Sequence, residues 1–272
     1  MSNVNSRRYV NMPVTTLWTS PMAPRDVDAW AVAPAPDVVA WLADVDKADA
    51  RLGLHGRALT QLELGEPVDI IGQADGGWLE VVAPMQPSSV DARGYPGWLL
   101  AGHVSERVPD RSPLGVTGDS VTSLDSPDPL RSGHGAEALI ARAREHLGLS
   151  YLWGGMCDWG LDCSGLVHLS LRRLGLVFPR DADDQYDACQ HVSAADALPG
   201  DLYFFAHEGE RPHHVGIVTA PGIMLHAPET GAVIVEEPLT PERRSSLIGA
   251  GRVEALEPEA MPSAKAGTGR TG

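Results

Sequence analysis

The chain has 272 residues, of which 43% are hydrophobic, and this is enough to build the cores of two ordinary domains. Its 36 acidic and 21 basic residues give a net charge of −15, which argues against nucleic acid or an anionic membrane surface as a partner. The three cysteines form no CxxC pair and no disulfide framework, so the composition fits a reducing compartment.

The N-terminal residues include Arg7 and Arg8, but no apolar stretch follows them. No segment approaches about 18 uninterrupted apolar residues, the minimum for a membrane-spanning helix. We therefore expect neither export nor membrane insertion, and we expect the protein in the cytoplasm.

Residues 57–106 alternate short strand-like runs with glycine and proline. The runs are PVDII, WLEVV and GWLLA. Such alternation is typical of a small β-barrel or sandwich rather than of βαβ units. We therefore expect a small all-β domain, which together with the segment before it occupies residues 1–107.

Three later segments are distinguished by their composition. Residues 108–134 are dense in Pro, Ser, Asp and Gly, which predicts a linker. Residues 136–148, AEALIARAREHLG, have an amphipathic pattern that ends at a glycine, and they predict a helix near the start of a second domain at 135–255. Residues 256–272 show no periodicity and are expected to stay disordered.

The stretch LDCSGLVHLSLRRLGL, residues 161–176, predicts a helix that begins at Cys163. Apolar or small residues recur along it with the i, i+3, i+4 spacing of one buried face, at positions 163, 166, 167, 170, 171 and 174. His168, Arg172 and Arg173 fall on the opposite face, where we expect solvent. A thiol at a helix start meets unpaired N–H groups and the positive end of the helix dipole, which lower its pKa from ~8.5. Cys163 is therefore the candidate nucleophile.

A nucleophilic thiol needs a base that the fold brings close to it. His214 opens the strand-like run HVGIVTA, and His226 lies in the next run, IMLHAP. With a three-residue loop at 220–222, His226 falls opposite Gly216 and both histidines point to the same face, whereas a two-residue loop would separate them. The pair then fits a base, His214, that is oriented by His226.

The remaining cysteines and histidines leave alternatives. His213 could serve as the base if the strand register slips by one residue. Cys157 and Cys189 head no helix near a base, which favours structural roles. Cys163 and the histidines could instead bind zinc, although they lack the i, i+4 or CxxC spacing that usually anchors this metal.

Several motifs of the second domain occur together in one order: YLWGG (151–155), DCSG (162–165), FPRDADDQ (178–185), LPGDLYFF (198–205), HVGI (214–217) and LHAP (225–228). With these motifs the chain resembles the NlpC family of bacterial cell-wall cysteine peptidases, which are small relatives of papain. The resemblance covers residues 135–253 and implies an α+β, papain-like fold. It also implies Cys163 as nucleophile, His214 as base and His226 as the residue that orients the base.

A second resemblance concerns the N-terminal part. VTTLWTSP (14–21) and residues 57–99 resemble the bacterial SH3-like accessory domain of one subgroup. Members of that subgroup cleave γ-D-glutamyl-diamino-acid bonds in short peptides derived from peptidoglycan. They usually carry a second SH3-like domain where this chain has residues 108–134.

The subgroup resemblance implies substrate-binding residues. The residues that match Asp162 and Tyr95 bind the free α-amine of the substrate's L-Ala, and the tyrosine that matches Tyr151 lines the cleft. From the residues alone, Asp162 could instead merely cap the helix through its side chain, and Tyr151 could be a core aromatic. A carboxylate and a phenol suit an ammonium, because a charge-assisted hydrogen bond contributes about 1.5–3 kcal/mol. We expect Ser164, next to the cysteine, to bind substrate as well.

The chain departs from the subgroup at two positions. A further acidic amine ligand, expected just before Thr60, is replaced by Leu59, and the polar residue often found in the PRD motif is Ala182. These departures bear on the specificity for the amine rather than on the reaction class.

The expected protein is a cysteine endopeptidase that hydrolyses the γ-D-glutamyl-diamino-acid bond of peptides with a free N-terminal L-Ala, in the recycling of wall peptides. The expected reaction passes through a thioester and needs no metal or organic cofactor. There are two alternatives. One is an amidase or acyltransferase on the same scaffold, and the other is a catalytically silent protein that binds wall fragments. The sequence leaves open the oligomeric state and the choice between diaminopimelate and lysine in the substrate.

Overall fold

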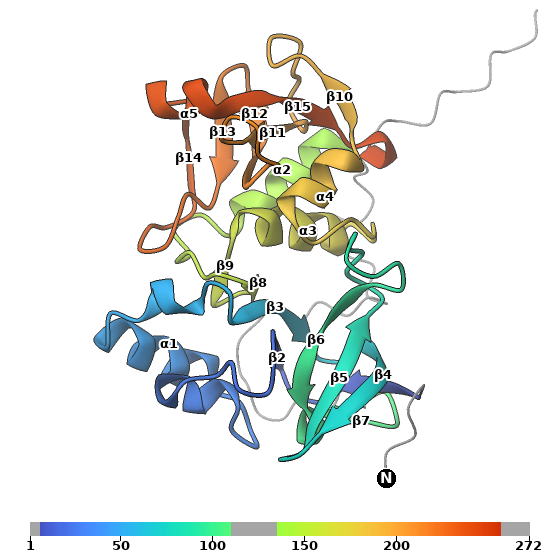
Figure 1. Cartoon of the computed structure of the whole chain (residues 1–272). Helices are drawn as coiled ribbons and strands as arrows, with labels where there is room; N and C mark the ends of the chain where they lie inside the picture. Colours follow the sequence, from blue (N-terminus) through green and yellow to red (C-terminus); the bar gives the residue numbers. More distant parts are fainter. Residues whose placement is uncertain (1–5, 110–134, 257–272) are drawn as a thin grey trace, which may run out of the picture.

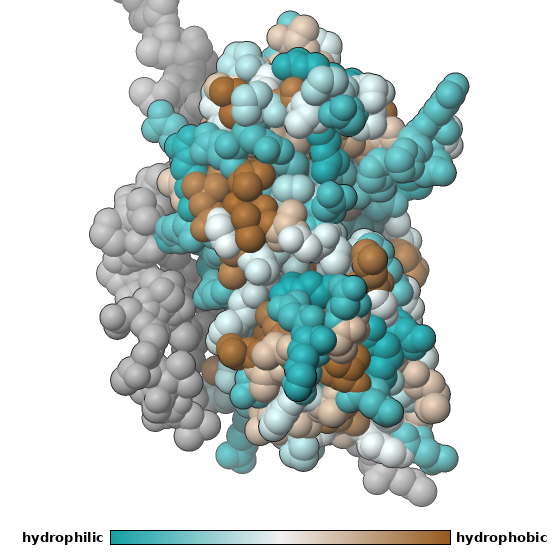
Figure 2. Space-filling model, turned by 90° about the vertical axis from the view of Figure 1, so that its left-hand side faces the viewer, coloured by the Kyte–Doolittle hydropathy of each residue, from teal (hydrophilic) through white to brown (hydrophobic). Residues whose placement is uncertain are grey.

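The computed structural model describes residues 6–109 and 135–256, which form two β-rich parts (Figure 1). The expected linker and tail lie outside the described residues, apart from residues 108, 109 and 256. In the described ranges, no helix has the length and apolar character needed to cross a bilayer. Seen from the side where α1 lies in Figure 1, the surface is mostly hydrophilic and is interrupted by small, separate hydrophobic patches (Figure 2).

The N-terminal part is built on a seven-stranded antiparallel sheet with the strand order β3-β2-β6-β5-β4-β1-β7. Its strands are β1 (Arg7–Val10), β2 (Val14–Trp18), β3 (Ala58–Glu63), β4 (Pro67–Ala74), β5 (Trp78–Ala83), β6 (Tyr95–Leu100) and β7 (Val104–Ser105). Burial alternates along β6, where Tyr95, Gly97 and Leu99 face inward, as expected for a strand with one core face. The strands predicted from residues 57–106 are therefore present, and β1 and β2 extend the same sheet.

A helical segment between β2 and β3 was not predicted from the sequence. It contains η1 (Asp26–Ala31), α1 (Val38–Lys47) and η2 (Arg51–Leu54). Asp37 caps α1 by accepting a hydrogen bond from the Ala40 backbone N–H at 2.9 Å. The buried residues of α1 follow helical spacing and pack into a core cluster with β2: Val38, Trp41, Leu42 and Val45.

The C-terminal part places helices against a six-stranded antiparallel sheet with the order β10-β15-β11-β12-β13-β14. The strands are β10 (Gln190–Val192), β11 (Leu202–Phe205), β12 (His214–Ala220), β13 (Ile223–His226), β14 (Val235–Pro238) and β15 (Leu247–Arg252). The helices are α2 (Ala136–Arg144), α3 (Cys163–Arg173), α4 (Ala182–Asp187), α5 (Pro241–Ser246) and η5 (Glu254–Leu256). A short hairpin, β8 (Met156–Cys157) and β9 (Gly160–Leu161), precedes α3, and η3 (Ala101–His103) precedes β7.

The helix α3 begins at Cys163, as predicted, but its two faces are both covered. His168 was expected on a solvent-exposed face and is only 1% exposed, so that prediction was wrong. Its Nδ1 lies 3.4 Å from the Pro179 carbonyl oxygen, and burial lowers its pKa to about 3. Arg172 is also largely buried, and it donates a 2.7 Å hydrogen bond to Glu66 of the N-terminal part. Packing against the segment near Pro179 and against the N-terminal part therefore explains the difference.

Hydrogen bonds between the two parts connect β3 to β8 and to the last residue of α3. The Met156 backbone N–H donates to Gln61 Oε1 at 3.1 Å, and Arg173 donates to Glu63 at 2.6 Å. These bonds connect β8 and the end of α3 to β3, and Figure 1 shows β8 beside β3. Arg180, which pairs with Asp162 directly before α3, also donates to Thr60 Oγ1 at 2.8 Å, so β3 lies near the first turn of α3 as well.

The turn between β12 and β13 differs from the prediction, although the two histidines still share a face. Ala220 pairs with Ile223, which leaves a two-residue turn rather than the predicted three-residue loop. A bulge between Val218 and Ala220 restores the register, so Ile217 pairs with Leu225. The extra residue in the bulge thus has the same effect on side-chain direction as an extra residue in the loop.

Candidate active site

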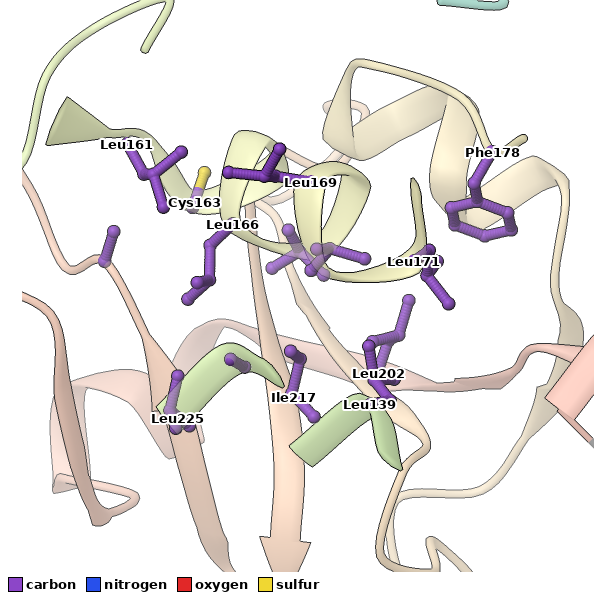
Figure 3. Close-up of a cluster of buried hydrophobic side chains, with 14 of the residues drawn as sticks. Leu139, Leu161, Cys163, Leu166, Leu169, Leu171, Phe178, Leu202, Ile217 and Leu225 are labelled. Atoms are coloured by element: carbon purple, nitrogen blue, oxygen red, sulfur yellow. The ribbon is translucent and has the colours of Figure 1, made fainter. Parts of the chain in front are cut away.

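The candidate nucleophile lies where α3 meets the sheet. Figure 3 shows the Cys163 sulfur at the first turn of α3, next to Leu161 and at the edge of the buried hydrophobic cluster. The sulfur lies against the backbone N–H groups of Ser164 and Val215. Since Val215 directly follows His214 on β12, the thiol and the first candidate base are brought together by the packing of α3 on this strand.

The thiol does not have the low pKa that the helix start predicts. Burial raises the pKa of Cys163 to about 12, and the negative charge of Asp162 acts in the same direction. The Val215 and Ser164 N–H groups lower the pKa but do not offset these effects. The prediction of a depressed thiol pKa is therefore corrected, because it considered the helix dipole without the loss of solvent.

The two candidate histidines are buried and in direct contact. His214 Nε2 lies 2.8 Å from His226 Nδ1, and the two rings are steeply inclined, at 76°. Burial lowers the pKa of His214 well below 6.5, with a further contribution from the positive charge of Arg243. Burial also lowers the pKa of His226 to about 4, against the opposing effect of the Glu237 carboxylate. Both imidazoles are therefore neutral near pH 7 in the free protein.

A carboxylate that the sequence analysis missed lies behind the histidines. Glu237 Oε1 is 3.2 Å from His226 Nε2. The opposite ring nitrogen of His226 contacts His214, so the three side chains form a continuous chain. The register of β13 with β14, in which Met224 pairs with Glu237, could not be read from the sequence.

The structure does not bring the side chain of His213 into the line of contacts formed by His214, His226 and Glu237. Its ring stacks on His207 with a centroid distance of 4.3 Å, and both side chains are exposed. In the described part of the chain, one group of side chains has donor atoms close enough together to hold a metal ion, and it consists of Asp181, Asp183 and Asp184. This group includes none of the residues considered for zinc.

Asp162 is held inside a buried network. Its two oxygens accept hydrogen bonds from the backbone N–H groups of Gly154 (2.8 Å) and Gly165 (2.6 Å). They also form a bidentate ion pair with Arg180, at 2.9 and 2.6 Å. Ser164 joins the same network, because its hydroxyl oxygen accepts from Arg180 at 2.9 Å. The carboxylate that was expected to bind the substrate amine is thus already engaged as a helix cap and as the partner of a buried arginine.

The carboxylate beside Tyr95 is Asp181, not Asp162. The Tyr95 hydroxyl donates to Asp181 Oδ2 at 2.7 Å, across the interface between the two parts. Burial raises the pKa of Asp181, while the positive charge of the neighbouring Arg180 lowers it. Asp181 is a second residue that the sequence analysis missed, although it stands in the quoted motif FPRDADDQ.

Tyr151 lies close enough to Cys163 for the thiol to influence its ionisation. Burial raises the pKa of Tyr151, and the electrostatic interactions with Cys163 and Asp162 act in the same direction. Of the two departures, Leu59 lies against the site, because a Cβ on Gly154 would approach the Leu59 carbonyl oxygen to 3.2 Å. Ala182 is buried at the start of α4.

Comparison with known proteins connects this geometry to a family. Residues 148–252 match the NlpC/P60 family. The chain is 32% identical over 267 residues to the gamma-D-glutamyl-L-lysine dipeptidyl-peptidase of Bacillus subtilis, covering 81% of this chain and 90% of that protein. The enzyme of the same name from Bacillus cereus is 26% identical, with 91% of each chain covered. A crystal structure of an NlpC/P60 family protein from Bacillus cereus superposes with a TM-score of 0.76 at 25% identity, covering 93% of this chain and 100% of that one. The chain therefore belongs to the NlpC/P60 family of cysteine peptidases.

Proposed function

We propose that this protein is a dipeptidyl-peptidase that cleaves the bond between the γ-carboxyl of D-glutamate and a diamino acid in peptides derived from peptidoglycan. Two relatives that match nearly the whole chain bear the name gamma-D-glutamyl-L-lysine dipeptidyl-peptidase. The observation that carries the proposal is the contact of Tyr95 with Asp181, which sets a carboxylate and a phenol side by side as acceptors for a free amine. The proposed leaving group is lysine or diaminopimelate.

The two parts of the chain have distinct proposed roles. Residues 135–255 are the proposed papain-like catalytic domain, because a helix headed by a cysteine packs on an antiparallel sheet that carries the histidines. Residues 1–107 are the proposed SH3-like domain, and 108–134 the linker between them. The N-terminal domain supplies Tyr95 and so takes part in substrate selection.

In the proposed reaction, Cys163 attacks the γ-carbonyl carbon of D-glutamate and His214 accepts the thiol proton. Burial keeps both groups neutral in the free enzyme, so proton transfer accompanies attack rather than preceding it. The Cys163 backbone N–H at the start of α3 contributes to the oxyanion hole. His214 then protonates the leaving amine, and water hydrolyses the thioester to release L-Ala-γ-D-Glu. The proposed mechanism uses no metal or organic cofactor.

The proposed amine site is formed by Asp181 and Tyr95. An ammonium placed beside the Asp181 carboxylate would make a charge-assisted hydrogen bond, and the adjacent phenol oxygen offers a further acceptor. The Asp162 carboxylate, which was first expected in this role, instead holds Arg180 next to Asp181. Tyr151 and Ser164 remain proposed residues of the cleft wall, on either side of the cysteine along the chain.

Product analysis by mass spectrometry tests this function. We expect L-Ala-γ-D-Glu-L-Lys or its diaminopimelate counterpart to yield L-Ala-γ-D-Glu and the free diamino acid. We expect no cleavage of the N-acetylated peptide and none of purified sacculi, in which the L-Ala amine is blocked; this would fit the recycling of released peptides. Efficient digestion of sacculi would contradict the proposed specificity, and capture of the acyl group by an added amine instead of water would identify an acyltransferase.

A further inference from the structure

Three side chains form one line of contacts leading away from the cysteine. His214 Nε2 is 2.8 Å from His226 Nδ1, and His226 Nε2 is 3.2 Å from Glu237 Oε1. Glu237 reaches His226 diagonally across β13 and β14, since Met224 pairs with Glu237 and His226 pairs with Val235. Its side chain is 40% exposed on the edge strand of the sheet, whereas both histidines are buried.

The chemistry of the carboxylate sets the direction of these hydrogen bonds. An ionised carboxylate only accepts, so His226 must carry its proton on Nε2 and donate it to Glu237. A neutral His226 then has a lone pair on Nδ1, which can only accept from His214 Nε2–H. A neutral His214 with its proton on Nε2 has its lone pair on Nδ1.

The backbone next to His214 lies against the cysteine, which favours Nδ1 as the nitrogen that receives the thiol proton. Nδ1 is the ring nitrogen nearer to the main chain, and the main chain of His214 continues directly into Val215, whose N–H lies against the Cys163 sulfur. The opposite direction of hydrogen bonding would place a proton on His214 Nδ1 and remove the base. It would also turn the lone pair of His226 Nε2 toward the Glu237 carboxylate, which is unfavourable.

We propose that Glu237 is a positioning residue that fixes the tautomers of His226 and His214, so that His214 Nδ1 takes the proton of Cys163. This inference rests on the proposed function. When the S–H bond breaks, its proton moves to Nδ1, the electron pair of the sulfur forms the bond to the carbonyl carbon, and His214 becomes an imidazolium. The new positive charge is then connected to the Glu237 carboxylate through two hydrogen bonds.

The other charged groups near the histidines disfavour an imidazolium, and the Glu237 carboxylate opposes their effect. Arg243 stacks over the Phe205 ring, with its Cζ 5.6 Å from the ring centroid, and the same ring lies 5.5 Å from that of His214. The positive charge of Arg243 disfavours an imidazolium at either histidine, and His213 acts on His214 in the same direction. Among the described residues for which these influences are given, Glu237 is the group that favours the charged form of His226.

The chain offers a matched control on the same strand. Glu236 is the neighbour of Glu237 but lies on the opposite face of β14, where Arg144 donates to it at 2.9 and 2.7 Å. Glu236→Gln removes the same charge from the same strand without touching the histidines. Glu237→Ala removes both charge and acceptor, and Glu237→Gln removes the charge but can keep an acceptor oxygen.

Nitrogen NMR of the histidine rings tests the tautomers directly, in a Cys163→Ala background and without substrate. We expect His214 and His226 of the parent and of Glu236→Gln to carry their protons on Nε2, and Glu237→Ala to show mixed tautomers. A proton on His214 Nδ1 in the parent, or unchanged tautomers in Glu237→Ala, would overturn the proposal.

Kinetics with the cysteine present supply the second readout. We expect Glu237→Ala to lower kcat about tenfold at unchanged KM, because the variant loses both the preference for the reactive tautomer and the carboxylate charge that favours the imidazolium. We expect a smaller loss of kcat for Glu237→Gln and none for Glu236→Gln. Equal kcat values for Glu237→Ala and Glu236→Gln would contradict the inference. A parent enzyme that cleaves no γ-D-glutamyl peptide would defeat the proposed function alone, since the NMR result does not depend on the substrate.

Discussion

Replacing Asp181 by Asn should separate amine recognition from the chemistry of the cysteine. Asp181 accepts the Tyr95 hydroxyl at 2.7 Å and lies beside the buried Arg180, so Asn keeps the size of the side chain and removes its charge. A charge-assisted hydrogen bond to an ammonium contributes about 1.5–3 kcal/mol, which corresponds to a loss of roughly 10- to 150-fold in kcat/KM. The assay is the initial rate of lysine release from L-Ala-γ-D-Glu-L-Lys.

The decisive comparison uses the N-acetylated peptide. Acetylation removes the ammonium from the substrate, so it should lower the kcat/KM of the wild-type enzyme by the same factor or more. It should lower the kcat/KM of Asp181→Asn little further, because that variant has already lost the interaction. Asp183→Asn is the control, because Asp183 is on the same segment but pairs with the exposed Arg211 at 2.8 Å. If Asp181→Asn discriminates between free and acetylated peptides as strongly as the wild type, Asp181 does not bind the amine.

Four other substitutions, one absorbance measurement and one pH series have defined outcomes. Asp162→Ala should destabilise the fold by about 3–5 kcal/mol in urea unfolding, because it leaves the buried Arg180 without its partner; a loss of activity at full stability would return Asp162 to a substrate-binding role. Cys163→Ala should abolish turnover with an unchanged unfolding midpoint, and His214→Ala should cost more than His226→Ala in kcat, since the base is harder to replace than its orienter; appreciable turnover by Cys163→Ala would refute the assignment. Thiolate absorbance attributable to Cys163 should be missing near pH 7, because burial raises its pKa, and a clear signal at pH 6 would show the ion pair instead. Stability should fall between pH 6.5 and 5 by about 2 kcal/mol for each buried neutral histidine, His168 and His226, because the unfolded chain binds protons there and the folded chain does not; a flat profile over this range would contradict their low pKa values.

The local sequence pattern was sufficient to predict the elements that carry Cys163, His214 and His226. The helical spacing after Cys163 predicts α3 and its start, and period-2 alternation predicts that His214 and His226 share a face. Both signals depend on neighbours within a few residues. The predictions based on them are therefore correct even though the turn between the strands differs from the predicted one.

Three of the differences involve contacts between distant segments. His168 was predicted to be exposed because its own helix has a polar face, whereas the chain near Pro179 and the N-terminal part cover that face. Asp162 was expected to bind the substrate amine, and its place next to the cysteine in the sequence could not reveal that Arg180 pairs with both of its oxygens. Glu237 reaches His226 only through the register of an edge strand.

The central claim is that Cys163 carries the dipeptide as a thioester. The direct measurement is mass spectrometry of peptides from the enzyme after acid quenching during turnover of L-Ala-γ-D-Glu-L-Lys, with fragmentation to separate Cys163 from Cys157. The account predicts an L-Ala-γ-D-Glu adduct on Cys163 that is absent in Cys163→Ala. An adduct on Cys157 or Cys189, or steady turnover by the Cys163→Ala protein, would contradict it.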